Sequence, residues 1–217
     1  ISVHFLNAHM YNVHIMNIKQ KTDKATLEIL QVIGNKEDIT QRHLASKLDV
    51  ALGLANSYLK RCVSKGLIKV TQAPANRYLY YLTPKGFAEK SRLTTAYLSQ
   101  SFNFYRSAGE SLSELFLECE KKKYKNILFY GASELSEIAA IRSQEHDLNI
   151  VGILDPESER KKILHFPVWK DIEEIDKFDV CILTALEKAM SYYKLLIREI
   201  GKKKIMIPSI LSIYDGN

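Results

Sequence analysis

The sequence predicts an α/β chain in which an N-terminal winged helix, a helical connector and a small Rossmann-like parallel sheet follow one another. Three observations predict this order. Apolar residues recur at helical spacing before residue 66, and two strand-like segments follow them. Continuous apolar segments alternate with helical ones from residue 126 onward. Residues 16–92 contain 14 Lys and Arg against 6 Asp and Glu, whereas residues 93–217 contain 17 against 19. The basic half therefore favours a polyanionic partner.

Composition excludes several protein classes. The chain has 217 residues, of which 46% are hydrophobic, so it can form a packed core. No apolar stretch of about 18 residues occurs, which argues against a membrane span or a membrane partner. Three cysteines, Cys62, Cys119 and Cys181, lie far apart without metal-ligand spacing. We therefore expect no disulfide scaffold and no metal site, and a reducing cytoplasm as the compartment.

The first fifteen residues differ from the rest. Residues 1–15 carry no Lys, Arg, Asp or Glu, and they lack the basic start and small-residue cleavage site of a signal peptide. We interpret them as a non-native or disordered extension.

Three helices are predicted next. Asp23 can cap a first helix that ends at Gly34. Thr40 can cap a second, which runs through residue 48, and a third follows over about 51–65. A short helix, a tight turn and a longer helix form the helix-turn-helix pattern.

A hairpin completes this domain. Residues 67–70 and 78–82 read as strands, and the polar segment 71–77 between them contains turn-forming residues. Three helices followed by a hairpin predict a winged helix domain over residues 16–92.

The segments ITQRHLASKLDVALGLANSYLKRCVSKGLIKV and YLYYLTPKGFAEKSRLT resemble MarR-type winged helix-turn-helix regulators, and among them the branch associated with exopolysaccharide gene clusters. The resemblance covers residues 23–100. Its markers are Gly66-Leu67-Ile68 and the segment 82–86, whereas Asp49 stands where the family commonly has Gly. Asp also accepts turn conformations. The resemblance implies a DNA-binding transcriptional regulator, and the exopolysaccharide-associated branch implies surface-polysaccharide genes as its targets.

The third helix would enter the major groove with its N-terminal half. Asn56 can bond adenine edges, Lys60 or Arg61 can bond guanine or phosphate, and Arg77 lies at the tip of the wing. The alternative is that these are ordinary solvated side chains on a protein-binding winged helix. The residues predicted to bind double-stranded DNA are Gln41, Arg42, Asn56, Ser57, Lys60, Arg61 and Arg77.

The connector, residues 93–123, is too apolar to remain exposed as a single helix. The resemblance to MarR-type proteins implies that it forms the interface of a homodimer. The alternative is a helix packed within its own chain.

Residues 124–217 are expected to form the Rossmann-like domain. Such sheets bind ligands at the carboxyl ends of their strands. The first turn, 131–136, keeps only the first glycine of G-x-G-x-x-G, and Glu134 would repel a pyrophosphate. Asp155 ends the second strand, where it could hold ribose hydroxyls. The predicted ligand-binding residues are Gly131, Ala132, Ser133, Asp155, Thr184 and Ala185.

The segments ILFYGASELSEIAAI, LNIVGILDPES, FPVWKDIEEI and FDVCILTA resemble the small Rossmann-like domains of sugar-modifying acyltransferases and the dinucleotide domain of Rex-type redox-sensing repressors. No cofactor is fixed by this resemblance; it implies a nucleotide-type ligand, either a nucleotide sugar or NAD(H). No nucleophile elbow or acid–base pair points to catalysis, so we expect no enzyme. The competing functions are a small nucleotide-sugar-modifying enzyme and a protein–protein adaptor, each with an accessory winged helix.

Overall fold

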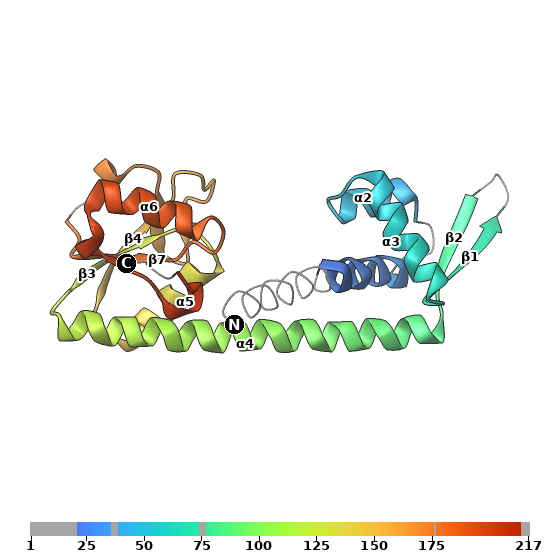
Figure 1. Cartoon of the computed structure of the whole chain (residues 1–217), viewed down its shortest axis with the longest axis horizontal. Helices are drawn as coiled ribbons and strands as arrows, with labels where there is room; N and C mark the ends of the chain where they lie inside the picture. Colours follow the sequence, from blue (N-terminus) through green and yellow to red (C-terminus); the bar gives the residue numbers. More distant parts are fainter. Residues whose placement is uncertain (1–20, 36–38, 74–76, 176, 214–217) are drawn as a thin grey trace, which may run out of the picture. The chain divides into compact units, whose positions relative to one another are not determined.

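The computed structural model describes residues 21–35, 39–73, 77–175 and 177–213. It divides into two compact units, Ile1–Gln100 and Ser101–Asn217 (Figure 1). The extension expected at residues 1–15 lies outside the described residues. None of the described helices combines the length and the apolar composition that crossing a membrane requires.

The N-terminal unit is a winged helix, as predicted. Residues 21–35 are helical, and Asp23 lies inside this helix, so the prediction that it caps the helix is wrong. Thr40 is a cap as expected, because its hydroxyl accepts a hydrogen bond from the His43 amide at 3.1 Å. The elements that follow are α2 (Gln41–Lys47), α3 (Leu52–Ser64), β1 (Ile68–Ala73), β2 (Arg77–Leu82) and α4 (Pro84–Lys121).

The turn between α2 and α3 shows why Asp49 is tolerated there. Its φ is 50°, in the left-handed region that favours Gly and also accepts Asp and Asn. The Val50 amide donates to the Ala45 carbonyl at 3.1 Å and closes the turn. Leu44, Ala55 and Leu59 then meet in one buried core.

The end of the wing is fixed to the start of α4. The Thr83 hydroxyl donates to the Gly66 carbonyl at 2.7 Å and accepts from the Gly86 amide at 3.0 Å. A Cβ on Gly86 would lie 2.0 Å from the Leu67 carbonyl oxygen, so only glycine permits this close approach. Pro84 occupies the first helical position, where a missing N–H costs nothing. Helix α4 consequently begins at Pro84, earlier than the connector expected from residue 93.

The C-terminal unit contains a six-stranded sheet in the order β5-β6-β4-β3-β7-β8. Five strands are parallel, in the order of a doubly wound fold, and β5 pairs antiparallel with β6 at one edge. The predicted parallel sheet is thus present, with an added edge hairpin. Its strands are β3 (Asn126–Tyr130), β4 (Asn149–Leu154), β5 (Lys162–Ile163), β6 (Phe166–Trp169), β7 (Val180–Leu183) and β8 (Ile205–Met206).

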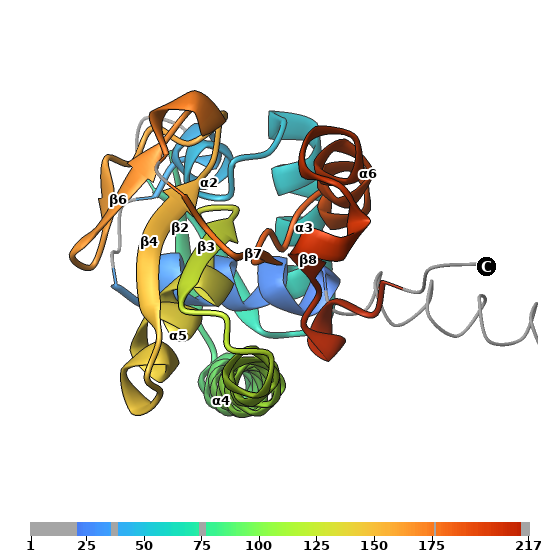
Figure 2. The same ribbon diagram turned by 90° about the vertical axis from the view of Figure 1, so that its left-hand side faces the viewer.

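Helices cover both faces of this sheet (Figure 2). Ala108, Leu112 and Phe116 from the second half of α4 are buried against one face, together with residues of α5 (Glu134–Arg142). The other face packs against α6 (Ala189–Ile200), with Leu196 fully buried. Since both faces are covered, the strands carry the continuous apolar runs that the sequence shows.

Candidate functional site

Helix α3 presents the exposed polar residues that a recognition helix needs. Ser57, Lys60 and Arg61 are exposed, and the apolar side of the helix, with Ala55 and Leu59, is buried. An exposed cationic helix face of this kind can bind phosphate and base edges.

The remaining predicted DNA contacts lie on α2, α3 and β2, and they differ in exposure and in their contacts. Arg42 is exposed in the first turn of α2. Gln41 is also exposed, but its amide donates to the Tyr80 hydroxyl at 3.3 Å and so links α2 to β2. Asn56 is half-buried rather than outward, and its Oδ1 is buried without a partner among the described residues. Arg77 is the first residue of β2, where it pairs with Ala73 across the hairpin.

The start of α3 exposes apolar side chains. Leu52 is 42% exposed and Leu54 is 46% exposed. The DNA contacts predicted from the sequence were polar or charged side chains, so Leu52 and Leu54 were not among them. In a major groove such side chains can contact the methyl group of thymine.

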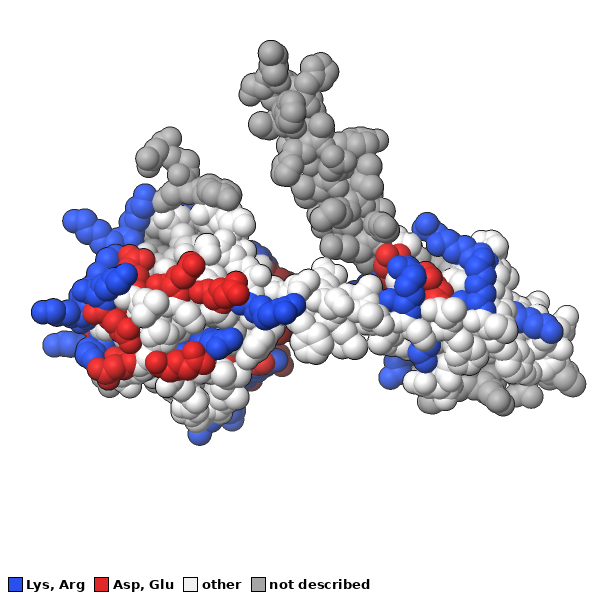
Figure 3. Space-filling view, turned by 90° about the horizontal axis from the view of Figure 1, so that it is seen from below, with Lys and Arg blue, Asp and Glu red and all other residues white. Residues whose placement is uncertain are grey.

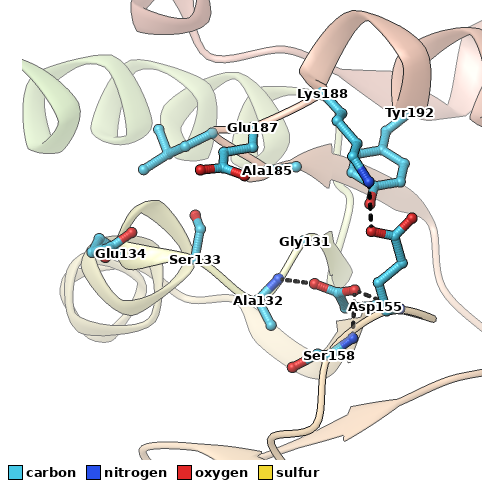
Figure 4. A pocket seen from close by; sticks show the side chains of 12 residues that line it. Gly131, Ala132, Ser133, Glu134, Asp155, Ser158, Ala185, Glu187, Lys188 and Tyr192 are labelled. Carbon is cyan, nitrogen blue, oxygen red and sulfur yellow. Dashed lines mark hydrogen bonds and ion pairs between the residues drawn. The ribbon is translucent and has the colours of Figure 1, made fainter. Parts of the chain in front are cut away.

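A second candidate site lies in the C-terminal unit (Figure 4). It is a pocket of about 310 Å³ at the carboxyl ends of β3, β4 and β7, where a doubly wound sheet binds its ligands. Five of the six predicted ligand-binding residues line it. The lining residues are Gly131, Ala132, Ser133, Glu134, Asp155, Glu157, Ser158, Ala185, Leu186, Glu187, Lys188 and Tyr192.

Thr184, the sixth predicted residue, is fully buried next to the pocket. Its hydroxyl lies 3.0 Å from the Tyr130 carbonyl oxygen and 2.8 Å from that of Gly131. Because the hydroxyl is engaged with the end of β3, Thr184 joins β7 to β3. It is therefore placed to shape the pocket.

The structure explains why glycine occupies position 131 in the first turn. Gly131 has φ +105°, and a Cβ there would lie 2.5 Å from the Cβ of Ala185 and 2.6 Å from its backbone N. The ends of β3 and β7 can approach this closely only with glycine. Gly131 consequently allows β3 and β7 to lie close together where they line the pocket.

The Ala132 and Ser133 amides of this turn are already bonded within the chain. Asp155 Oδ2 accepts from the Ala132 amide at 2.8 Å, while Oδ1 accepts from the amides of Glu157 and Ser158. The Ser133 amide donates to the Ser136 hydroxyl at 3.1 Å, and Ser133 caps α5. A phosphate entering this turn would have to displace these bonds, unlike one at an open glycine-rich turn.

The charge of the pocket also opposes phosphate. Four carboxylates, those of Glu134, Asp155, Glu157 and Glu187, line it with a single lysine. Lys188 Nζ bonds Glu157 Oε2 at 2.8 Å, and this bond, together with one from Tyr192, lowers the pKa of Glu157. The anionic character therefore favours hydroxyl-rich or cationic groups of a ligand over its phosphates.

Sequence reasoning selected the residues at the strand ends and missed those just beyond them. Glu157 and Ser158 lie three and four residues after the end of β4, and Glu187 and Lys188 precede α6. A signal was available, because residues that follow the carboxyl end of a parallel strand lie at the ligand edge. Among the described residues, no group of three or more His, Cys, Asp or Glu side chains could hold a metal ion.

Comparisons with known proteins support the assignment of the N-terminal unit as a winged helix. Residues 22–69 match a family model described as winged helix-turn-helix DNA-binding. This match and the helix and hairpin order above identify the N-terminal unit as a winged helix-turn-helix domain. No curated protein matches the chain.

Several solved structures are similar to part of the chain. MepR, a transcription regulator of Staphylococcus aureus, is 17% identical, with 45% of this chain and 80% of MepR covered at a TM-score of 0.34. AdcR of Streptococcus pyogenes is 17% identical, with coverages of 49% and 80% and a TM-score of 0.35. A MarR family protein of Mycobacterium tuberculosis is 14% identical, with coverages of 48% and 83% and a TM-score of 0.34.

Proposed function

We propose that the chain is a cytoplasmic, DNA-binding transcriptional regulator of the MarR type. The observation that carries the proposal is the winged helix-turn-helix match at residues 22–69, with Ser57, Lys60 and Arg61 exposed on α3. The excess of eight positive charges in residues 16–92 supports a polyanionic partner for this unit. The resemblance to the exopolysaccharide-associated branch suggests surface-polysaccharide genes as targets.

We further propose that two copies bind DNA together. Leu98, Phe102 and Tyr105 recur at i, i+4 and i+7 on α4 and are 47%, 62% and 40% exposed. This spacing places them on one face of the helix, and an apolar stripe of this kind favours a second copy of the same helix. A dimer would place two recognition helices on half-sites about 10 bp apart.

The expected result for DNA binding is a strong dependence on salt. Each phosphate neutralised contributes about −0.9 to the slope of log K against log salt concentration. Fluorescence anisotropy with duplexes from the gene's own upstream region would measure the slope, and footprinting would locate the half-sites. Affinity that does not change between low and physiological salt, or no binding to any fragment, would contradict the proposed function.

The pocket supports a second proposal, that the C-terminal unit binds a small effector. Its position at the ends of β3, β4 and β7 is the observation that favours this function. Both nucleotide-type ligands expected contain a pyrophosphate, which would have to lie away from the four carboxylates. A nucleotide sugar fits the pocket better than NAD(H), because its additional sugar ring offers more hydroxyls, from which carboxylates can accept hydrogen bonds. A regulatory effector must bind one conformation more tightly than another, since equal affinity shifts no equilibrium.

Calorimetry with nucleotide sugars, free sugars, NAD, NADH and coenzyme A tests the effector proposal. We expect binding by a hydroxyl-rich ligand, with at least a tenfold loss of affinity in Glu187→Lys. Because Glu187 is exposed, this variant should fold as the wild type does. Turnover of any of these compounds would instead favour the nucleotide-sugar-modifying enzyme, and absence of binding would favour the adaptor.

A further inference from the structure

Lysines precede three neighbouring strands of the C-terminal sheet. Parallel strands place their amino ends at one edge, and β3, β7 and β8 are adjacent in the strand order. This edge is opposite to the one that forms the pocket. The lysines that precede these strands, here called the lysine edge, are Lys121, Lys122, Lys123, Lys125, Lys177, Lys202, Lys203 and Lys204.

Contacts within the unit bring these segments together. Asp179, just before β7, accepts hydrogen bonds from the amides of Lys125 and Asn126 at 2.7 and 2.8 Å. These amide bonds, and to a smaller extent the charge of Lys204, lower the pKa of Asp179. Lys204 Nζ also lies 5.6 Å from the centre of the Phe178 ring. The segments before β3, β7 and β8 therefore form one surface.

Neighbouring acids neutralise only part of this charge. Glu118 pairs with Lys122 at 2.6 Å, and Asp147 pairs with Lys125. The Asp179 carboxylate is engaged by backbone amides. Within the described part of the chain, four exposed lysines of the edge form neither an ion pair nor a ring contact, and blue side chains project from the C-terminal unit in Figure 3. These four are Lys121, Lys123, Lys177 and Lys203.

We propose that the lysine edge is a second, sequence-independent binding surface for the phosphate backbone of duplex DNA. This inference rests on the proposed function, which supplies DNA as the polyanion. Lysine ammonium groups are mobile point charges that suit phosphate oxygens without fixing a base sequence. Several such charges on one edge can contact several phosphates of one duplex. The surface adds affinity for all DNA sequences, while α3 reads bases.

The experiment compares two full-length variants that each lose four positive charges. The edge variant is Lys121→Gln, Lys123→Gln, Lys177→Gln and Lys203→Gln. The control removes exposed lysines elsewhere in the same unit, with Lys161→Gln, Lys162→Gln, Lys170→Gln and Lys194→Gln. Anisotropy with 40-bp duplexes, one of genomic and one of scrambled sequence, is measured from 50 to 300 mM salt. A third variant, Lys60→Gln with Arg61→Gln, removes two positive charges from α3 and so weakens only the DNA contact of the winged helix.

The edge variant should lose about tenfold in affinity at 100 mM salt for both duplexes, and its salt slope should fall by about 2, which corresponds to two or three lost phosphate contacts. The control variant should retain the wild-type slope to within about 0.5. An edge variant that binds as the wild type does would overturn the inference while leaving the proposed function in place. Equal losses in edge and control variants would also overturn it. Full binding by the Lys60 and Arg61 variant, with loss in the edge variant, would overturn the proposed DNA contact of α3 and leave the lysine edge as a DNA-binding surface.

Discussion

Gly131→Val is expected to destabilise the C-terminal unit strongly. The new Cβ would lie 2.5–2.6 Å from the Cβ, Cα and N atoms of Ala185. Two of these atoms are backbone, so the collision cannot be relieved by a side-chain rotation. The φ of +105° adds backbone strain for any residue with a Cβ. Overpacking and strain together should lower the free energy of unfolding by about 3 kcal/mol or more.

Urea unfolding followed by circular dichroism would measure this loss. Gly201→Val is the matched control in the same unit, since φ there is +81° and a Cβ would have no atom within 4 Å. The control should lose only the strain contribution, about 1–2 kcal/mol. Equal losses in the two variants would show that the approach of Ala185 does not restrict position 131. Because Gly131 is structural, a substitution there cannot test ligand binding, which is why Glu187 is the better position for that test.

The elements with strong periodicity could be predicted from the sequence. The second strand of the C-terminal half, expected to end at Asp155, is β4, which ends at Leu154; Ile150, Ile153 and Leu154 are buried within a covered parallel sheet. Thr40 could be predicted as a cap because a Thr hydroxyl can accept a hydrogen bond from an unpaired amide in the first turn of a helix, here that of His43. Local chemistry determines both features, so no knowledge of tertiary contacts was needed.

Other features depend on contacts between distant residues. Strands β5 and β6 are two and four residues long, too short for a pattern, and Pro167 argues against a strand. Ligand binding by Asp155 stays a prediction, but the sequence did not show that its carboxylate accepts hydrogen bonds from three backbone amides, one of them in the turn after β3. Asn56 was placed outward by helical spacing, but packing at the side of α3 buries its Oδ1. Spacing along one helix does not show what neighbouring elements cover.

The double substitution Lys60→Glu and Arg61→Glu is expected to weaken DNA binding severely at physiological salt. Both side chains are exposed on α3, so their replacement should leave the core of Ala55 and Leu59 intact. Each lost contact costs about 1–3 kcal/mol, and two new carboxylates would repel the phosphates. We therefore expect that reversing both charges lowers the affinity for DNA by at least about 100-fold, since about 1.4 kcal/mol corresponds to tenfold.

Anisotropy titration at 150 mM salt would measure the loss, and a thermal melt would show whether the variant keeps the fold. Lys21→Glu with Lys24→Glu is the matched control, because it makes the same charge change at exposed positions of the first helix. Long-range repulsion is screened beyond about 8 Å at this ionic strength, so the control should weaken binding only a few-fold. If both double variants lost affinity equally, the net charge of the unit would explain DNA binding, and α3 would have no special part in it. A loss confined to the Lys60 and Arg61 variant would place the DNA on the exposed face of α3, because only there are the two charges close enough to the phosphates to escape screening.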